Sequence, residues 1–102
     1  MNTTFKMLEL FGDFLVDGDL ANRFRFCEVE SSWSGSETVV FDFAGVRSVT
    51  DSFAQGCFGN LVQSQGEQFL VKVRLENCSG AVKDTLSATI ARGLQSHAKL
   101  VH

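Results

Sequence analysis

The segment 38–66 constrains the fold most, because a buried strand is followed directly by a polar turn and a helix. Residues 39–43 form an almost continuous apolar run, which is typical of a strand that is covered on both faces and central in its sheet. The spacing of Ser52 and Gln55 fits a capping box, so we expect Ser52 to be the N-cap of the helix. The segment therefore predicts a strand, a turn and a helix in that order.

Apolar side chains recur at i, i+4 and i+8 along this helix, and Gly66 is expected to end it in the left-handed conformation. Cys57 falls on the apolar stripe, which predicts a buried thiol. Gly56 and Gly59 each cost the helix about 1 kcal/mol relative to alanine. Two explanations stay open: close packing of the helix backbone, or a smooth groove in which a partner docks.

Two short apolar segments at the start of the chain, 3–11 and 14–16, flank Gly12 and Asp13. This pattern predicts a β-hairpin with a type II′ turn, and a helix over residues 5–11 is an open alternative. Asp19 is then expected to be the N-cap of a helix that ends near residue 30, before a serine-rich turn.

In this helix after Asp19, Leu20, Phe24 and Cys27 share one face, so we expect Cys27 to be buried, like Cys57. Residues 69–75 alternate between apolar and polar, which predicts a half-buried strand with its basic side chains in water. Ser79 is the expected N-cap of a final amphipathic helix.

Strands that are separated by helices require right-handed crossovers and a parallel central sheet, whereas the N-terminal hairpin adds antiparallel edges. The sequence therefore predicts an α/β fold with a mixed β-sheet. With 102 residues, the chain is long enough for one domain, 1–102, and too short for a second core.

The order VVFDF, AGV and VTDSFAQG, over residues 39–56, resembles the signature of STAS domains. In that signature a strand ending in Asp is followed by a Gly-Val pair and an Asp-Ser-Ser-Gly turn that opens a helix. Because Phe53 replaces the second Ser and Ala54 the Gly, the chain is closer to the STAS-like family of uncharacterised function. The resemblance implies a single STAS-like domain with the order ββαβαβα and helices mainly on one sheet face.

The resemblance also implies a regulatory function through protein binding, as in the antagonists of anti-sigma factors. The implied partner is a histidine-kinase-like ATPase or another regulatory protein, and an inhibitor of a host protein made by a phage would look the same. A partner kinase phosphorylates the second Ser in classical antagonists, and Phe53 occupies that position here. Ser52 or Thr50 could accept phosphate instead, although helix capping by itself explains Ser52.

We therefore expect a non-catalytic interaction module that binds its partner through the turn from Arg47 to Phe53 and the helix that follows. Trp33 either covers the rim of the core or contacts a partner. The expected partner-binding residues are Arg47, Thr50, Asp51, Ser52, Phe53, Gln55 and Trp33. The alternative from another class is a sensor of a nucleotide, another small ligand or an anion at the N-terminus of the Ser52 helix.

Catalysis is not expected. The only candidate reactive groups near the turn are Asp42, Asp51 and Cys57, and no histidine in the segment could activate the thiol. Both carboxylates are explained more simply by hydrogen bonds to turn amides, and Arg47 by a solvated surface charge.

The composition argues against several other classes of function. A net charge of −3 without a basic cluster argues against binding to nucleic acid or to anionic lipid. Three scattered cysteines and two histidines, His97 and His102, predict no disulfide framework, no metal site and no cofactor. No leader or bilayer-spanning run is present, so we expect a cytoplasmic protein, either a monomer or a homodimer.

Overall fold

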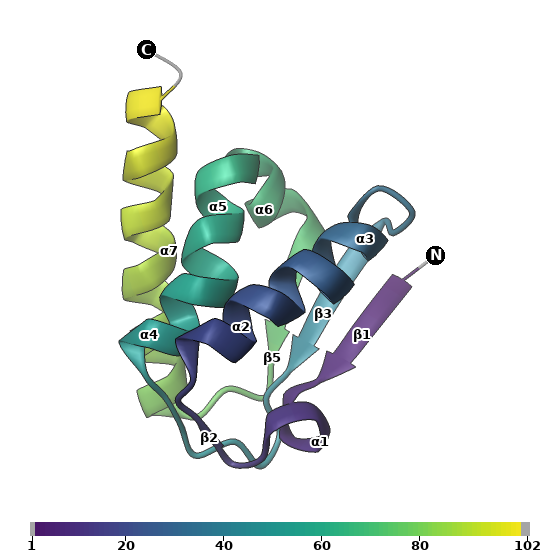
Figure 1. Ribbon diagram of the computed structural model, residues 1–102, viewed down its shortest axis with the longest axis vertical. Coiled ribbons are helices and arrows are strands. Elements are labelled where there is room, and N and C mark those ends of the chain that lie inside the picture. Colours follow the sequence, from purple (N-terminus) through teal and green to yellow (C-terminus); the bar gives the residue numbers. More distant parts are fainter. Residues whose placement is uncertain (1, 101–102) are drawn as a thin grey trace.

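A three-stranded parallel sheet with the order β1-β3-β5 forms the centre of the fold in the computed structural model, which describes residues 2–100 (Figure 1). A separate pair of two-residue strands, β2 and β4, is also parallel. The strands are β1 (Asn2–Lys6), β2 (Phe14–Leu15), β3 (Thr38–Asp42), β4 (Ser48–Val49) and β5 (Val73–Glu76).

Two long helices, each interrupted by a π-helical turn, connect the strands of the main sheet. The first consists of α2, η1 and α3, and the second of α4, η2 and α5. A short helix, α1, lies between β1 and β2, α6 precedes β5, and α7 ends the described chain. The helical segments are α1 (Met7–Phe11), α2 (Gly18–Phe24), η1 (Arg25–Val29), α3 (Glu30–Trp33), α4 (Asp51–Ala54), η2 (Gln55–Gly59), α5 (Asn60–Gln65), α6 (Glu67–Lys72) and α7 (Gly80–Leu100).

The helices lie mainly on one face of the sheet, as the family resemblance implied (Figure 1). In the central strand, Val39 and Phe41 are fully buried, whereas Val40 and Asp42 are only half-buried. The central place of this strand is therefore confirmed, but the prediction that both of its faces are covered was wrong. The uncovered face carries most of the polar side chains of the three strands, including Lys6, Asp42 and Arg74.

The predicted N-terminal hairpin, and with it the mixed sheet, is not observed. Every strand pair in the described residues is parallel, and the segment after β1 turns into α1. Met7 and Phe11 are spaced i, i+4, so both turn toward the core, and Met7 is fully buried. Gly12 ends this helix with φ 87°, a conformation that glycine adopts without strain. The element order therefore differs from ββαβαβα.

The prediction of a strand over residues 69–75 was only half correct. Its first part is helix α6, in which Phe69 is buried while Val71 is 79% exposed. Only Val73 onward is strand, with Val73 and Leu75 half-buried and Arg74 exposed. Phe69 and Val73 are four residues apart, so their spacing fits a helix as well as an alternating strand, and the sequence could not separate the two.

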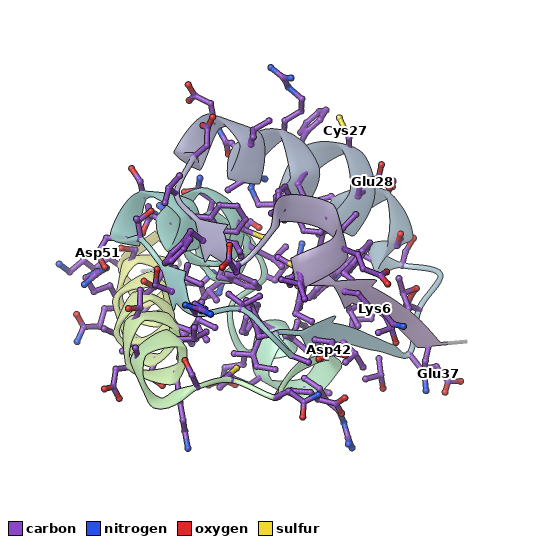
Figure 2. All side chains as sticks on the ribbon, turned by 90° about the horizontal axis from the view of Figure 1, so that it is seen from below. Lys6, Cys27, Glu28, Glu37, Asp42 and Asp51 are labelled. Carbon is purple, nitrogen blue, oxygen red and sulfur yellow. The ribbon has the colours of Figure 1, made fainter. Side chains whose placement is uncertain are left out.

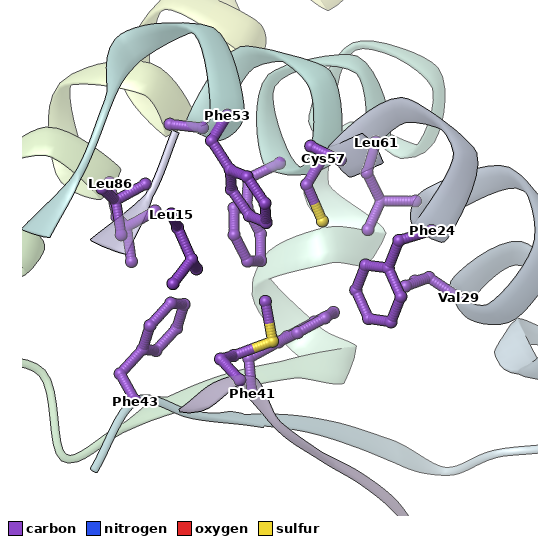
Figure 3. Packing of buried hydrophobic residues seen from close by; sticks show 14 of the residues in the cluster. Leu15, Phe24, Val29, Phe41, Phe43, Phe53, Cys57, Leu61 and Leu86 are labelled. Atoms are coloured by element: carbon purple, nitrogen blue, oxygen red, sulfur yellow. The ribbon is translucent and has the colours of Figure 1, made fainter. Parts of the chain in front are cut away.

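Phenylalanine side chains fill the space between the sheet and the helices (Figure 3). Phe41 contacts Phe58 edge-on with ring centroids 4.8 Å apart, and Phe5 stacks on Phe41 at 5.5 Å. Phe41, Phe43, Phe53 and Phe58 are all among the largest fully buried side chains. Such aromatic pairs stabilise the core beyond the area that they bury.

The π turn η1 changes which residues of the first long helix face the core. The buried side chains are Ala21, Phe24 and Val29, so the last step spans five residues. Cys27 is consequently exposed, and the prediction that it is buried was wrong. The helix also begins earlier than expected, because Asp17 rather than Asp19 accepts the capping hydrogen bonds.

The final helix, α7, is as predicted at its start: the Ser79 hydroxyl accepts a hydrogen bond from the Val82 amide at 3.3 Å. It packs against α5 and η2. Over residues 2–100, every helix is too short or too polar to cross a bilayer.

Candidate functional site

The turn between β4 and the second long helix is fixed by the segment that contains β2. Phe14 is paired with Ser48 and Leu15 with Val49. The Arg47 amide donates to the Asp13 carbonyl at 2.8 Å, and the Thr50 amide donates to the Leu15 carbonyl at 2.9 Å. Segments 13–16 and 47–50 therefore form one rigid unit, although they are more than thirty residues apart.

The N-cap of the helix is Thr50, not Ser52 as predicted. Thr50 has extended backbone angles, its hydroxyl accepts from the Phe53 amide at 3.2 Å, and its carbonyl accepts from the Ala54 amide at 3.0 Å. The helix thus begins two residues earlier than the capping-box spacing indicated. The side chain of Gln55 does not reach back to the turn but donates to Asn60 at 3.1 Å.

Phe53 belongs to the core and not to the surface of the turn. It is 1% exposed, and its ring contacts Phe11 edge-on with centroids 5.0 Å apart. A buried ring cannot contact a partner, so this expected partner-binding residue has a structural role. Arg47, Asp51 and Ser52 are exposed, and Thr50 is half-buried.

Arg47 is the cation of the turn. Its Nε lies 3.7 Å from a carboxylate oxygen of Asp13, and both side chains are largely in water, 76% and 47% exposed. Exposed ion pairs of this kind add little stability. Both charged groups therefore stay accessible.

Two apolar side chains that the sequence analysis did not single out flank the turn. Phe14 is 54% exposed and Val16 is 58% exposed, while Leu15 between them is buried. Val16 adjoins the helix start, because its carbonyl accepts from the Thr50 hydroxyl at 3.2 Å. Successive side chains of a strand point to opposite faces, so the apolar run 14–16 could have indicated that Phe14 and Val16 are exposed if Leu15 is buried. We call Phe14, Val16, Arg47, Asp51 and Ser52 the turn surface. In Figure 2, Asp51 of this surface lies on the opposite side of the view from Cys27 and Glu28.

Trp33 is not part of the turn surface. It ends α3, at the other end of the first long helix from the turn (Figure 1). The Lys72 ammonium lies 5.1 Å from the ring centroid and also donates to the Trp33 carbonyl. The half-buried ring is thus held against α6 by a cation–π contact, which agrees with a ring that covers the rim of the core.

Gly56 serves close packing of the helix backbone, whereas at Gly59 the nearest atoms to an added Cβ belong to the flexible side chain of Gln55. A Cβ on Gly56 would lie 2.6 Å from the Gly18 carbonyl oxygen, so the helix touches the start of α2 there. A Cβ on Gly93 of α7 would lie 3.1 Å from the Gly59 carbonyl oxygen, so α7 approaches the helix from another side. Both helix glycines are buried, and the alternative of an open glycine groove was wrong.

A polar network joins the two long helices beside Gly56. The Arg25 Nε donates to the Gly56 carbonyl at 3.0 Å, and the same guanidinium contacts Asn22 and Glu30. Gln55 belongs to this network through Asn60, whose amide donates to Asn22 at 3.3 Å. These contacts give Gln55 a structural role between helices, although its side chain is exposed.

The candidate reactive groups do not converge. Cys57 is fully buried in the core (Figure 3), and burial raises the pKa of its thiol far above the ordinary range. The Asp42 carboxylate accepts hydrogen bonds from Asn77 at 2.9 Å and from the Ala44 amide at 3.0 Å, and these lower its pKa. This confirms that Asp42 satisfies turn amides. Within residues 2–100, no group of three or more metal-ligating side chains is present.

Comparison with known proteins adds one match. A family model described as a STAS-like domain of unknown function (DUF4325) matches residues 21–83, from α2 to the first turn of α7. Neither the curated proteins nor the solved structures provide a match. The family match spans well over half of the chain and includes the strand, turn and helix described above. The chain therefore belongs to the STAS-like domain family.

Proposed function

We propose that the chain is a non-catalytic regulatory module that binds a partner protein through the turn surface. One observation carries this proposal: Phe14 and Val16 expose more than half of their area directly beside the exposed charges of Arg47 and Asp51. Apolar side chains surrounded by charged ones are typical of interfaces in which a buried aromatic group provides affinity and the charged rim provides specificity.

The rigidity of the turn surface supports binding. Its two segments are joined by the β2–β4 pairing and by the hydrogen bonds of Thr50 to residues 15 and 16. A surface that is already ordered loses little conformational entropy when a partner binds. The partner in this proposal is a regulatory protein, such as a histidine-kinase-like ATPase.

Ser52 gives the same surface a means of regulation. It is exposed in the first turn of the helix, where a phosphate would be near free amides and the positive end of the helix dipole. Asp51 would repel that phosphate, and the added charge would change the turn surface. Thr50 is the poorer acceptor, because its hydroxyl already caps the helix and donates to Val16.

A non-catalytic role fits the state of the thiol. Cys57, the only candidate nucleophile near the turn, is sealed in the core with its pKa raised by burial, so it stays protonated and out of reach of a substrate.

An anion sensor at the helix start is the weaker proposal. The carboxylate of Asp51 lies in the first turn, and the cavity next to Phe53 has a volume of only about 90 Å³ and a mostly apolar lining. The sensor would be favoured if nucleotides or phosphate raised the melting temperature of the chain, and if Asp51→Asn, which removes the negative charge at the helix start, increased that effect.

The test is an affinity pull-down from native lysate, read by mass spectrometry. The wild type is compared with Arg47→Glu/Asp51→Lys, and with Arg74→Glu/Glu76→Lys as the matched control. Arg74 and Glu76 are exposed on the uncovered sheet face, and both variants keep the net charge. We expect one protein that the wild type and the control enrich and that the turn variant loses. Equal enrichment by all three proteins would contradict the proposal.

A further inference from the structure

A second surface of the chain, which adjoins the turn surface near Leu20, is an apolar groove of about 380 Å³ between α1 and the first long helix. Phe24 at its base contacts Phe5 and Phe11 edge-on, each with ring centroids 5.1 Å apart. Leu10 and Leu20 on its sides are 51% and 45% exposed. Together they form a continuous apolar lining that is open to solvent.

Two further apolar side chains of the same helix are exposed. Phe26 is 69% exposed, and Cys27, which lines the groove, is exposed beside it. The π turn η1 presents both side chains to solvent. A large exposed aromatic ring next to an apolar groove marks an interaction site.

The charges at the groove identify the occupant. Arg23 and Glu28 are its only charged lining residues, they carry opposite charge, and neither forms an ion pair with any other described residue. They lie at i and i+5 on the same helix, before and within the π turn η1. In an antiparallel, twofold arrangement of two such helices, each Arg23 meets the Glu28 of the other copy, so the surface is complementary to itself.

The strand beside the groove agrees with this arrangement. Phe5 places β1 in the groove lining, and β1 is an edge strand that pairs only with β3 among the described residues. A free edge without proline or a bulge is open to further association.

We propose that this groove, with Phe26 and Cys27, binds the same surface of a second copy of the chain about a twofold axis. Two ion pairs between Arg23 and Glu28 flank the apolar contact. Each chain then covers the exposed side chains of the other chain's groove.

The test is sedimentation equilibrium of the 102-residue chain over a range of concentrations. Arg23→Glu places Glu against Glu at both ends of the interface, and Glu28→Arg places Arg against Arg. Each single variant is expected to raise the dimer dissociation constant at least about tenfold. An equimolar mixture of the two variants restores opposite charges at both ends, so it is expected to form a heterodimer. This restoration also shows that the single variants are folded.

Cys27 supplies an independent readout. Cys78 is partly accessible, so it is first replaced by serine. In this Cys78→Ser background a short bismaleimide is expected to link two copies through Cys27 and to leave the additional Cys27→Ser variant uncrosslinked, because Cys57 is fully buried. A wild type that stays monomeric up to about 1 mM would overturn the proposal. A dimer that neither charge variant weakens, or a mixture that does not associate, would overturn it as well.

Discussion

The hydroxyl of Thr50 lies between two segments: it accepts a hydrogen bond from the Phe53 amide at 3.2 Å and donates one to the Val16 carbonyl at 3.2 Å. One side chain therefore both starts the second long helix and holds it against the β2 segment. The exposed residues of the turn surface owe their fixed geometry to this contact.

Thr50→Ala should lower the free energy of unfolding by about 1 kcal/mol, within the range of about 0.5 to 2 kcal/mol measured for lost N-caps. Ser52→Ala is the matched control. Its side chain is exposed and does not cap the helix, so we expect a change within about 0.5 kcal/mol. Urea unfolding measures both. A larger loss for Ser52→Ala than for Thr50→Ala would show that the cap is misassigned.

Gly56→Ala and Gly59→Ala should have opposite effects. The new methyl at residue 56 would lie 2.6 Å from the backbone carbonyl of Gly18, so the helices must separate, and crowding of this kind costs about 1 to 3 kcal/mol. The atoms nearest to the methyl at residue 59 would all belong to the side chain of Gln55, which can move. The higher helix propensity of alanine, up to about 1 kcal/mol, should then leave Gly59→Ala neutral or more stable. Thermal unfolding of both variants measures the difference, and destabilisation by equal amounts would disagree with this packing.

Phe53→Ala should destabilise the fold by about 3 to 5 kcal/mol, as expected for removing a buried aromatic ring. Phe14→Ala removes a ring that is 54% exposed, so its cost should stay within about 0.5 kcal/mol. Denaturant titration of the pair separates the core ring from the surface ring. An unchanged midpoint for Phe53→Ala would mean that the ring is on the surface.

The stability of the chain should fall at alkaline pH because of Cys57. Burial raises the pKa of its thiol, and the charge of Arg25 lowers it less, so the folded state keeps the proton longer than the unfolded chain does. The stabilising contribution is fully present below the unfolded pKa of about 8.5 and is lost progressively as the pH rises toward the folded pKa. The expected slope approaches about 1.4 kcal/mol per pH unit.

Unfolding free energies between pH 8 and 10 test this. Cys57→Ala should be less stable at pH 8 and should lose less stability on going to pH 10. Cys27→Ala, which changes an exposed thiol, should keep the wild-type slope. Equal slopes in all three proteins would argue against a buried, protonated Cys57.

Local sequence patterns correctly predicted several elements that a short window of residues defines. The central place of β3, a helix directly after the turn and the cap of α7 by Ser79 were predicted correctly from neighbouring residues, although the helix begins two residues earlier than predicted. The parallel sheet could not be read in this way. Residues 7–11 are apolar except for Glu9 and fit a strand as well as a helix, and only the parallel pairing of β1 with β3 shows that a hairpin does not follow.

The π turn η1 explains the error at Cys27. A π turn moves the buried face of a helix, so a regular 3.6-residue period placed Cys27 inside although it is exposed. The sequence analysis identified only some of the residues of the turn surface, for a different reason. Phe14 and Val16 join it through pairing with residues more than thirty positions away, which no local window contains.

Photo-crosslinking at the turn surface tests the central proposal most directly. A benzoylphenylalanine residue is placed at position 14 in one protein and at position 74, on the uncovered sheet face, in the other, and both are irradiated in native lysate. We predict one crosslinked partner protein from position 14, lost when Arg47→Glu/Asp51→Lys is added, and none from position 74. The same crosslinks from both positions, or none from position 14, would contradict a partner-binding turn surface.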